Sequence, residues 1–285
     1  MDKLGRRRME ERVFIVLMSA SILVVVGSLL SMFLTVLSKG LGALSLAMIT
    51  QTPRGGYYLG KEGGILNAIV GSLYLATGST LLSVLISVPI AIYLYEYAGE
   101  SRRTSYTRRM LDALCGIPSI VYGAFAFTVM IYFRARASLL WGILTVTLFE
   151  FPMMTRGIDE VLRTVPNRLR ETAFSLGSTR FETATRVVLR QALPGILTTV
   201  LIGFGRAIGD AAAVMLTAGY TDNIPSSLMD PVATLPLAVF FQLSTPIPEV
   251  QQRAYASGII LLFIVLGLSV FSRWSSKRLM RYVVR

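Results

Sequence analysis

The sequence predicts an all-α integral membrane protein with six transmembrane helices and with both termini in the cytoplasm. Hydrophobic residues make up 53% of the 285 residues and charged residues only 15%, a composition more apolar than that of most soluble proteins. The apolar residues are gathered into six runs, and Lys and Arg gather at the ends of particular runs. The net charge of +12 therefore indicates membrane topology rather than a nucleic-acid partner.

The six apolar runs are the expected transmembrane spans, because about 20 residues of helix cross the hydrocarbon core. They cover residues 13–37, 66–95, 111–133, 138–154, 193–220 and 254–271. The first run is too long for a signal peptide and lacks a small-residue cleavage site, so we expect it to stay as an anchor. Residues 1–12 form an N-terminal segment, residues 13–275 the transmembrane domain, and residues 276–285 a basic tail.

The distribution of positive charge orients these spans. Lys and Arg exceed Asp and Glu in the N-terminal segment, in residues 96–109, in residues 154–192 and in the tail, whereas residues 220–253 are net negative. The positive-inside rule places the first four segments in the cytoplasm of a prokaryotic cell and residues 220–253 outside. The weakly basic segments 39–65 and 134–136 oppose this assignment without reversing it.

The external loop 38–65 contains Gly55, Gly60 and Lys61 at the spacing of a phosphate-binding loop. Glu62 stands where a Ser or Thr should bind magnesium, and no strand precedes the loop. We therefore expect no nucleotide site there.

The second run carries small residues at helical spacing, which indicates close packing inside a bundle. They are Ser72, Ala76 and Thr80 on one stripe and Ser79, Ser83 and Ser87 on another. Three prolines, Pro89, Pro118 and Pro152, are expected to bend or break the second, third and fourth helices.

Charged residues inside the spans are the candidate transport residues. Arg206 lies near the middle of the fifth run, where an arginine costs at least ~2.5 kcal/mol unless it faces protein or water. Asp210 follows at i+4 and could pair with it. The pair could merely hold two helices together, or Arg206 could present a fixed charge to a passing anion. Glu150 could join this cluster or lie at the membrane interface.

Residues 166–192 predict a polar cytoplasmic helix, turn and helix. Pro166 suits the first turn of a helix, and Gly177 can adopt the left-handed conformation that ends one. Thr179 and Glu182 have the spacing of a capping box at the start of a second helix. The fifth run follows directly through Pro194.

Several motifs together resemble permease subunits of the phosphate-specific ABC importer, most of all its PstA-type subunit. The resemblance runs from about Gly63 to the end of the chain, and its most specific element is Ile-Pro-Ser-Ile-Val-Tyr-Gly at 117–123. The Glu-x-Ala-x-x-x-Gly pattern at 171–177 resembles the EAA loop that binds the ATPase. Further matches lie at 63–75, 91–98, 165–177, 192–196 and 206–209.

The resemblance implies a type I ABC import permease fold and assigns roles to residues of this chain. The ATPase-coupling residues would be Glu171, Thr172, Ala173, Phe174, Ser175, Leu176, Gly177, Ser178, Thr179 and Arg180. The translocation pathway would include Arg206, Asp210, Pro118, Ser119 and Glu150. The sequence departs from the family where Asp210-Ala-Ala-Ala replaces Glu-Thr-Ala-Pro and where Arg190 follows Leu189.

The implied partners are a second homologous permease subunit, two cytoplasmic ATPases, an extracytoplasmic phosphate-binding protein and membrane lipid. This chain would bind no cofactor, while the ATPases would use ATP and magnesium. With no His and one Cys, zinc chemistry and His-based acid–base catalysis are excluded, and we assign no metal ligand and no catalytic residue to this chain. A permease for sulfate, molybdate or tungstate remains an alternative, as does a lipid-modifying membrane enzyme that uses Asp112, Glu150 or Asp210.

Overall fold

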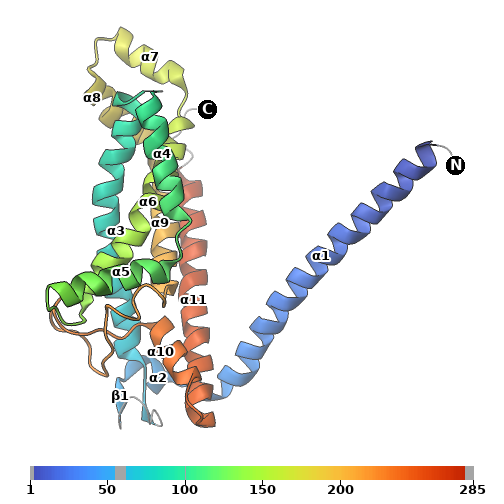
Figure 1. Cartoon of the computed structure of the whole chain (residues 1–285), viewed down its shortest axis with the longest axis vertical. Coiled ribbons are helices and arrows are strands. Elements are labelled where there is room, and N and C mark those ends of the chain that lie inside the picture. Colours follow the sequence, from blue (N-terminus) through green and yellow to red (C-terminus); the bar gives the residue numbers. More distant parts are fainter. Residues whose placement is uncertain (1–2, 55–61, 100, 280–285) are drawn as a thin grey trace.

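The computed structural model describes residues 3–54, 62–99 and 101–279, and it is almost entirely helical. Four helices run side by side as an upright bundle (Figure 1). They are α3 (Leu66–Ile92), α6 (Leu139–Arg163), α9 (Leu189–Gly209) and α11 (Pro248–Leu279). α4 (Arg102–Cys115) packs along α6, and α5 (Ser119–Tyr132) crosses the bundle.

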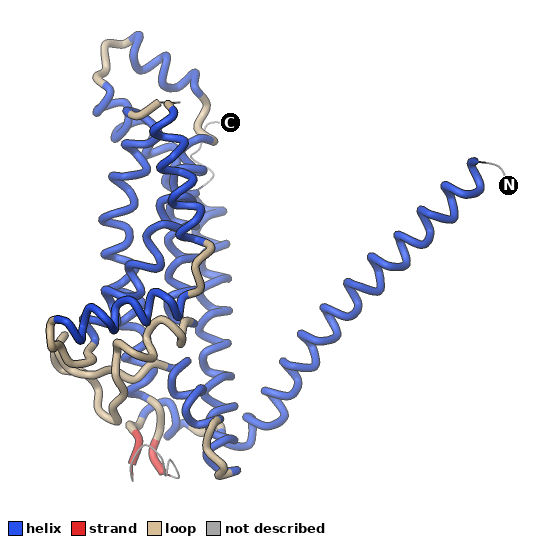
Figure 2. Tube along the Cα trace, in the orientation of Figure 1, coloured by secondary structure: helices blue, strands red, loops and turns tan. Residues whose placement is uncertain are grey.

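Short elements close the two ends of the bundle. One end carries α7 (Asn167–Ser175), α8 (Arg180–Glu182) and a π-helical turn, η3 (Thr183–Val188), that runs into α9. The other end carries η1 (Leu41–Ala43), α2 (Leu46–Thr50), α10 (Leu235–Leu243) and the antiparallel strands β1 (Pro53–Arg54) and β2 (Glu62–Gly63), shown in red in Figure 2. The phosphate-loop spacing at Gly55, Gly60 and Lys61 lies outside the described residues.

The first helix, α1 (Lys3–Gly40), leaves the bundle at an angle and touches it only near its C-terminal end (Figure 1). Its most apolar stretch has no residue buried by the rest of the chain. At the junction, a Cβ on Gly40 would lie 2.7 Å from the Tyr255 carbonyl carbon. Glycine is therefore what permits the close crossing of α1 and α11.

The contact between α3 and α6 is built from small and hydroxyl-bearing side chains, as their spacing indicated. The six stripe residues are all buried: Ser72, Ala76, Thr80, Ser79, Ser83 and Ser87. The Ser87 hydroxyl donates to the Phe151 carbonyl at 3.0 Å, and Thr147 donates back to the Ser79 carbonyl at 3.3 Å. These bonds link two helix backbones directly, which is how polar residues stabilise helix pairs in lipid.

The expected third span is interrupted rather than continuous. α4 ends at Cys115, Pro118 is the N-cap of α5, and the two helices meet at 94°. Pro118 has no N–H to continue the helix. The Tyr122 hydroxyl donates to the Leu114 carbonyl at 2.9 Å across the break, so the bend is held in place. Pro89 and Pro152, in contrast, lie inside continuous helices.

The fifth run also differs from the expected helix to residue 220. α9 ends at Gly209, and residues 210–234 form an irregular loop. Irregular backbone at membrane depth is tolerated where protein buries it. Here Ala213, Val214 and Ala218 have no exposed surface, and the N–H groups of Leu139 and Leu140, at the start of α6, donate to loop carbonyls at 2.8 Å.

Among the described residues, four helices are long and apolar enough to cross a membrane, or five if the bent pair α4 and α5 counts as one span. They are α1, α3 with its following turn, α8 through α9, and α11. α6 is not among them because Glu150 lies within its apolar part and Arg156 follows. The fold is thus an all-helical membrane bundle, in agreement with the predicted class.

Replacement of Gly203 by Val should destabilise the bundle by about 1–3 kcal/mol, the usual cost of overpacking. A Cβ there would lie 2.6 Å from Glu150 Oε1 and 2.9 Å from Met154 Cε. Gly205→Val is the matched control on the same helix, because nothing lies within 4 Å of its Cβ. Thermal unfolding of the purified chain in detergent measures both. Equal shifts for the two variants would contradict the packing.

Candidate functional site

Arg206 lies in the last turn of α9, and its side chain is exposed in the single chain. Its guanidinium carbon stacks 4.5 Å from the centre of the Phe149 ring, and Nη1 lies 3.1 Å from the Met153 sulfur. Both partners come from α6. Among the described residues, no carboxylate forms an ion pair with Arg206. The cation is held by a π face and a thioether, which leave donors available for an anion.

The expected pairing of Arg206 with Asp210 is absent. Because α9 ends at Gly209, Asp210 has extended backbone (φ −82°, ψ 122°), and the i, i+4 geometry of a helix no longer applies. Its Oδ1 instead accepts the Ala213 N–H at 2.7 Å and fixes the first turn of the 210–234 loop. Asp210 therefore shapes the backbone next to Arg206 without neutralising it.

Glu150 is buried inside the bundle, with only 1% of its surface exposed. Its two carboxylate oxygens accept hydrogen bonds from Thr80 and Ser83 of α3, each at 3.2 Å. A small cavity of about 210 Å³ is lined by Glu150 and by Met153, the residue that contacts Arg206. Glu150 on α6 and Arg206 on α9 thus belong to neighbouring parts of one site, which Met153 connects.

Pro118 and Ser119 lie at the break between α4 and α5, one turn before Tyr122. The Tyr122 ring lies 6.0 Å from that of Phe149, the ring on which Arg206 stacks. A Cβ on Gly123 would lie 2.7 Å from the Ala213 carbonyl oxygen, so α5 packs tightly against the loop that begins at Asp210. The structure therefore brings the bend to the same region as Arg206.

Sequence reasoning missed Phe149, Met153 and Tyr122 as parts of this region. An aromatic residue or a methionine is common in an apolar helix, and its position in the sequence follows no pattern that would mark it as the partner of a cation. The adjacency of Phe149 to Glu150 was the one available hint.

Residues 166–192 form the predicted helix, turn and helix. Gly177 has φ +84°, and nothing lies within 4 Å of a Cβ placed there. The capping box is confirmed: Glu182 N–H donates to Thr179 Oγ1 at 3.3 Å, and Thr179 N–H donates to Glu182 Oε2 at 3.1 Å. The backbone and hydroxyl hydrogen bonds from Thr179 lower the pKa of Glu182.

The side chains of this segment divide into an anchoring side and an outward side. Ala173 is buried, whereas Leu176 is 82% and Phe181 67% exposed. The other candidate coupling residues are exposed except Ser178, which is half-buried: Glu171, Thr172, Phe174, Ser175, Gly177, Thr179 and Arg180. Large apolar side chains exposed beside polar ones are typical of a protein interaction surface.

An ion pair anchors α7 to the end of α3. Arg170 Nη2 donates to Glu96 Oε1 at 3.0 Å, and the Arg170 guanidinium lies 5.1 Å from the centre of the Tyr95 ring. Glu96 belongs to the π-helical turn η2 (Tyr93–Tyr97), and its side chain is almost fully buried. Burial acts to lower the pKa of Arg170, but Glu96 and Tyr95 together outweigh it, so this pKa is raised.

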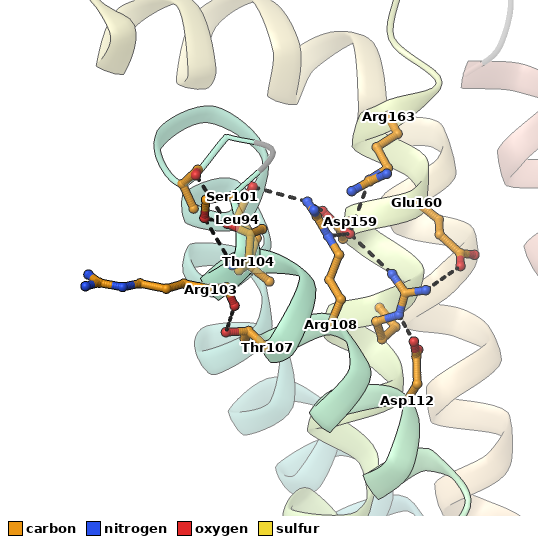
Figure 3. Close-up of polar contacts among 12 residues, drawn as sticks. Leu94, Ser101, Arg103, Thr104, Thr107, Arg108, Asp112, Asp159, Glu160 and Arg163 are labelled. Carbon is orange, nitrogen blue, oxygen red and sulfur yellow. Dashed lines mark hydrogen bonds and ion pairs between the residues drawn. The ribbon is translucent and has the colours of Figure 1, made fainter.

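A second charge cluster joins α4 to α6 (Figure 3). Asp159, fully buried on α6, accepts from Arg108 of α4 at 2.8 and 3.0 Å, and Arg156 and Arg163 approach it at 3.3 and 3.4 Å. Arg156 also pairs with Asp112 and Glu160. Sequence reasoning did not single out Asp159, although arginines at i−3 and i+4 were its visible signal.

Comparison with known proteins places this geometry in a family. Residues 87–282 match the family model of the binding-protein-dependent transport system inner membrane component. The phosphate transport system permease protein PstA of Pasteurella multocida is 33% identical over 239 residues, which cover 84% of each chain. The PstA protein of Yersinia pestis is 30% identical over 267 residues, covering 94% of this chain and 90% of the relative.

Solved structures agree at the level of the fold. A chain of a bacterial alginate ABC transporter in complex with its periplasmic protein superposes with a TM-score of 0.63, 13% identity, and coverage of 99% of this chain and 100% of that one. A chain of the inward-facing MetNI methionine ABC transporter gives a TM-score of 0.59 at 18% identity, covering 77% of this chain and 96% of that one. The chain therefore belongs to the family of binding-protein-dependent transport system inner membrane components.

Proposed function

We propose that this chain is one permease subunit of an ATP-driven importer of inorganic phosphate in the inner membrane. The observation that carries the proposal is Arg206, an arginine in a membrane helix whose contacts are a ring and a sulfur rather than a carboxylate. A planar guanidinium with free donors matches a tetrahedral oxyanion. The PstA relatives, about 30% identical over most of the chain, support phosphate as that oxyanion.

The proposed topology has six membrane crossings, with α4 and α5 forming one broken crossing and α6 another. The end of the bundle that bears α7 and α8 faces the cytoplasm, together with both chain termini. Positive charge at this end supports this orientation, as does the position of the start of α1 and the end of α11 in Figure 1. The 210–234 loop then faces outward.

The complete transporter would pair this chain with a second permease subunit, two ATPases and an external phosphate-binding protein. Two exposed apolar surfaces are available for contacts with lipid or with these partners. One is the length of α1, and the other is the tip formed by Leu176 and Phe181. ATP and magnesium would act in the ATPases. Force would pass from α7 and α8 through η3 into α9, which carries Arg206.

Arg206→Gln should abolish phosphate uptake while the complex still assembles, because the variant removes the charge but keeps a polar, unbranched side chain at an exposed position. Arg206→Lys should retain reduced uptake, since a point charge lacks the planar donor fork. Labelled phosphate uptake and copurification of the ATPase measure the two properties. Arg190→Gln is the control, on the same helix but about 24 Å away along its axis. Full uptake by Arg206→Gln would refute the proposal.

Gly177→Val should reduce ATPase attachment and uptake together, because a β-branched residue at positive φ costs about 1–2 kcal/mol. Gly177→Asn is the matched control, since Asn tolerates the left-handed conformation. No neighbour lies within 4 Å, so the two variants differ in backbone strain rather than in packing against this chain. If Gly177→Val copurifies with the ATPase as well as Gly177→Asn does, the turn is not part of the coupling element.

Glu96→Gln should uncouple ATP hydrolysis from uptake, because α7 loses its charged link to α3. Gln keeps an oxygen acceptor but not the negative charge, and loss of the charge-assisted bond to Arg170 is expected to cost about 1–3 kcal/mol of local stability. The charge-reversed double variant Glu96→Arg, Arg170→Glu should recover part of the uptake. The ratio of ATP hydrolysed to phosphate transported in proteoliposomes measures coupling. An unchanged ratio in Glu96→Gln would show that the pair does not transmit force.

A further inference from the structure

A polar cleft of about 420 Å³ lies at the cytoplasmic end of the bundle, apart from the Arg206 site. Its walls come from η2 at the end of α3, from α4, from the end of α6 and from the start of α7. The residues that matter to the argument are Tyr95, Glu96, Arg108, Arg163, Asn167 and Arg170. Three of these six side chains are guanidinium groups, and one is a carboxylate.

The positive charge of this cleft is incompletely neutralised. Asp159 lies behind it, fully buried, and is shared among Arg108, Arg156 and Arg163. Arg156 has further acidic partners on its other side, but Arg163 has only a 3.4 Å contact with the shared carboxylate and is 44% exposed. One carboxylate cannot offset the charge of both Arg108 and Arg163, so the cleft keeps an excess of positive charge.

Two donors at the cleft, Arg170 Nε and the Tyr95 hydroxyl, lack acceptors among the described residues, and one acceptor, Glu96 Oε2, lacks a donor. Arg170 uses Nη2 for Glu96, while its Nε is buried without a hydrogen-bond partner among the described residues. A buried unpaired donor costs free energy until an acceptor arrives. Asn167 begins α7, a nine-residue helix whose first N–H groups and dipole favour a negative charge at that end.

We propose that this cleft binds a phosphate-bearing anion, which bridges Arg108, Arg163 and Arg170. The anion is either free inorganic phosphate from the cytoplasm or the headgroup of an anionic phospholipid. Arg108 already donates through Nε and Nη2 to Asp159 and the Leu94 carbonyl, and Arg170 donates through Nη2 to Glu96, so Nη1 of each remains for an anion. Arg163, which is the most exposed of the three, has more of its guanidinium free to donate to phosphate oxygens. A bound anion links the coupling helix α7 to α4 and α6, and therefore makes the position of α7 sensitive to anion supply. This inference does not depend on which anion the transporter carries.

The test uses the full-length chain, purified in nanodiscs of zwitterionic lipid and titrated with sodium phosphate by calorimetry at constant ionic strength. Arg163→Gln should weaken phosphate binding about tenfold, as expected for loss of a charge-assisted contact. Asn167→Asp, which adds a repelling charge at an exposed position without loss of volume, should weaken it as well. Arg168→Gln, an exposed arginine of α7 outside the cleft, is the matched control and should bind as the parent does.

A second arm identifies the source of the anion. In nanodiscs that contain phosphatidylglycerol, native mass spectrometry counts the retained anionic lipids. If Arg163→Gln and Asn167→Asp lose a lipid that Arg168→Gln keeps, the occupant is a lipid headgroup. If these variants keep the lipid but bind phosphate more weakly in the calorimetric titration, the occupant is free phosphate. Either result supports the site. If the three variants and the parent behave alike in both arms, the cleft binds no such anion and the proposal is overturned.

Discussion

The close contact between α3 and α6 fixes the position of two sets of residues on α6: those that contact Arg206 and those around Asp159. In lipid, apolar helices gain little from burying apolar surface, so tight packing and interhelical hydrogen bonds hold them together. Small residues on α3 permit the approach, and Thr80 and Ser83 hold Glu150. At one level of α6, Phe149 and Met153 contact Arg206. At another level, Asp159 forms ion pairs with several arginines. A change in the spacing of these two helices would therefore disturb the surroundings of Arg206 and the charge cluster around Asp159 together.

The segment that contains α7 and α8 is attached to the bundle in two ways. One attachment is covalent and helical, since η3 continues directly into α9. The other is the buried pair between Glu96 and Arg170, which joins α7 to the end of α3. A push on the exposed tip would thus reach α9 and α3 at once, and these are the helices that hold Arg206 and the hydroxyl partners of Glu150.

The sequence predicted features that depend on neighbouring residues better than those that depend on distant ones. The capping box at Thr179, the positive φ of Gly177 and the break at Pro118 follow from local chemistry, and all three are present. The pairing of Arg206 with Asp210 failed because i, i+4 spacing has meaning only inside a helix, and α9 ends between them. The ring and sulfur that replace Asp210 come from α6, more than 50 positions earlier, where no spacing rule links them to Arg206.

The 210–234 loop has a consequence for the order in which the molecule forms. Its carbonyls accept N–H groups from Ser138 and Leu139 at the start of α6, and its Thr221 carbonyl accepts the side-chain amide of Asn67 on α3. These partners belong to segments synthesised earlier than the loop, and they add to hydrogen bonds within the loop such as those from the Ser226 and Ser227 N–H groups to Asp230. The final packing of the loop therefore requires that α3 and α6 have been inserted and paired, which makes it a late step in biogenesis.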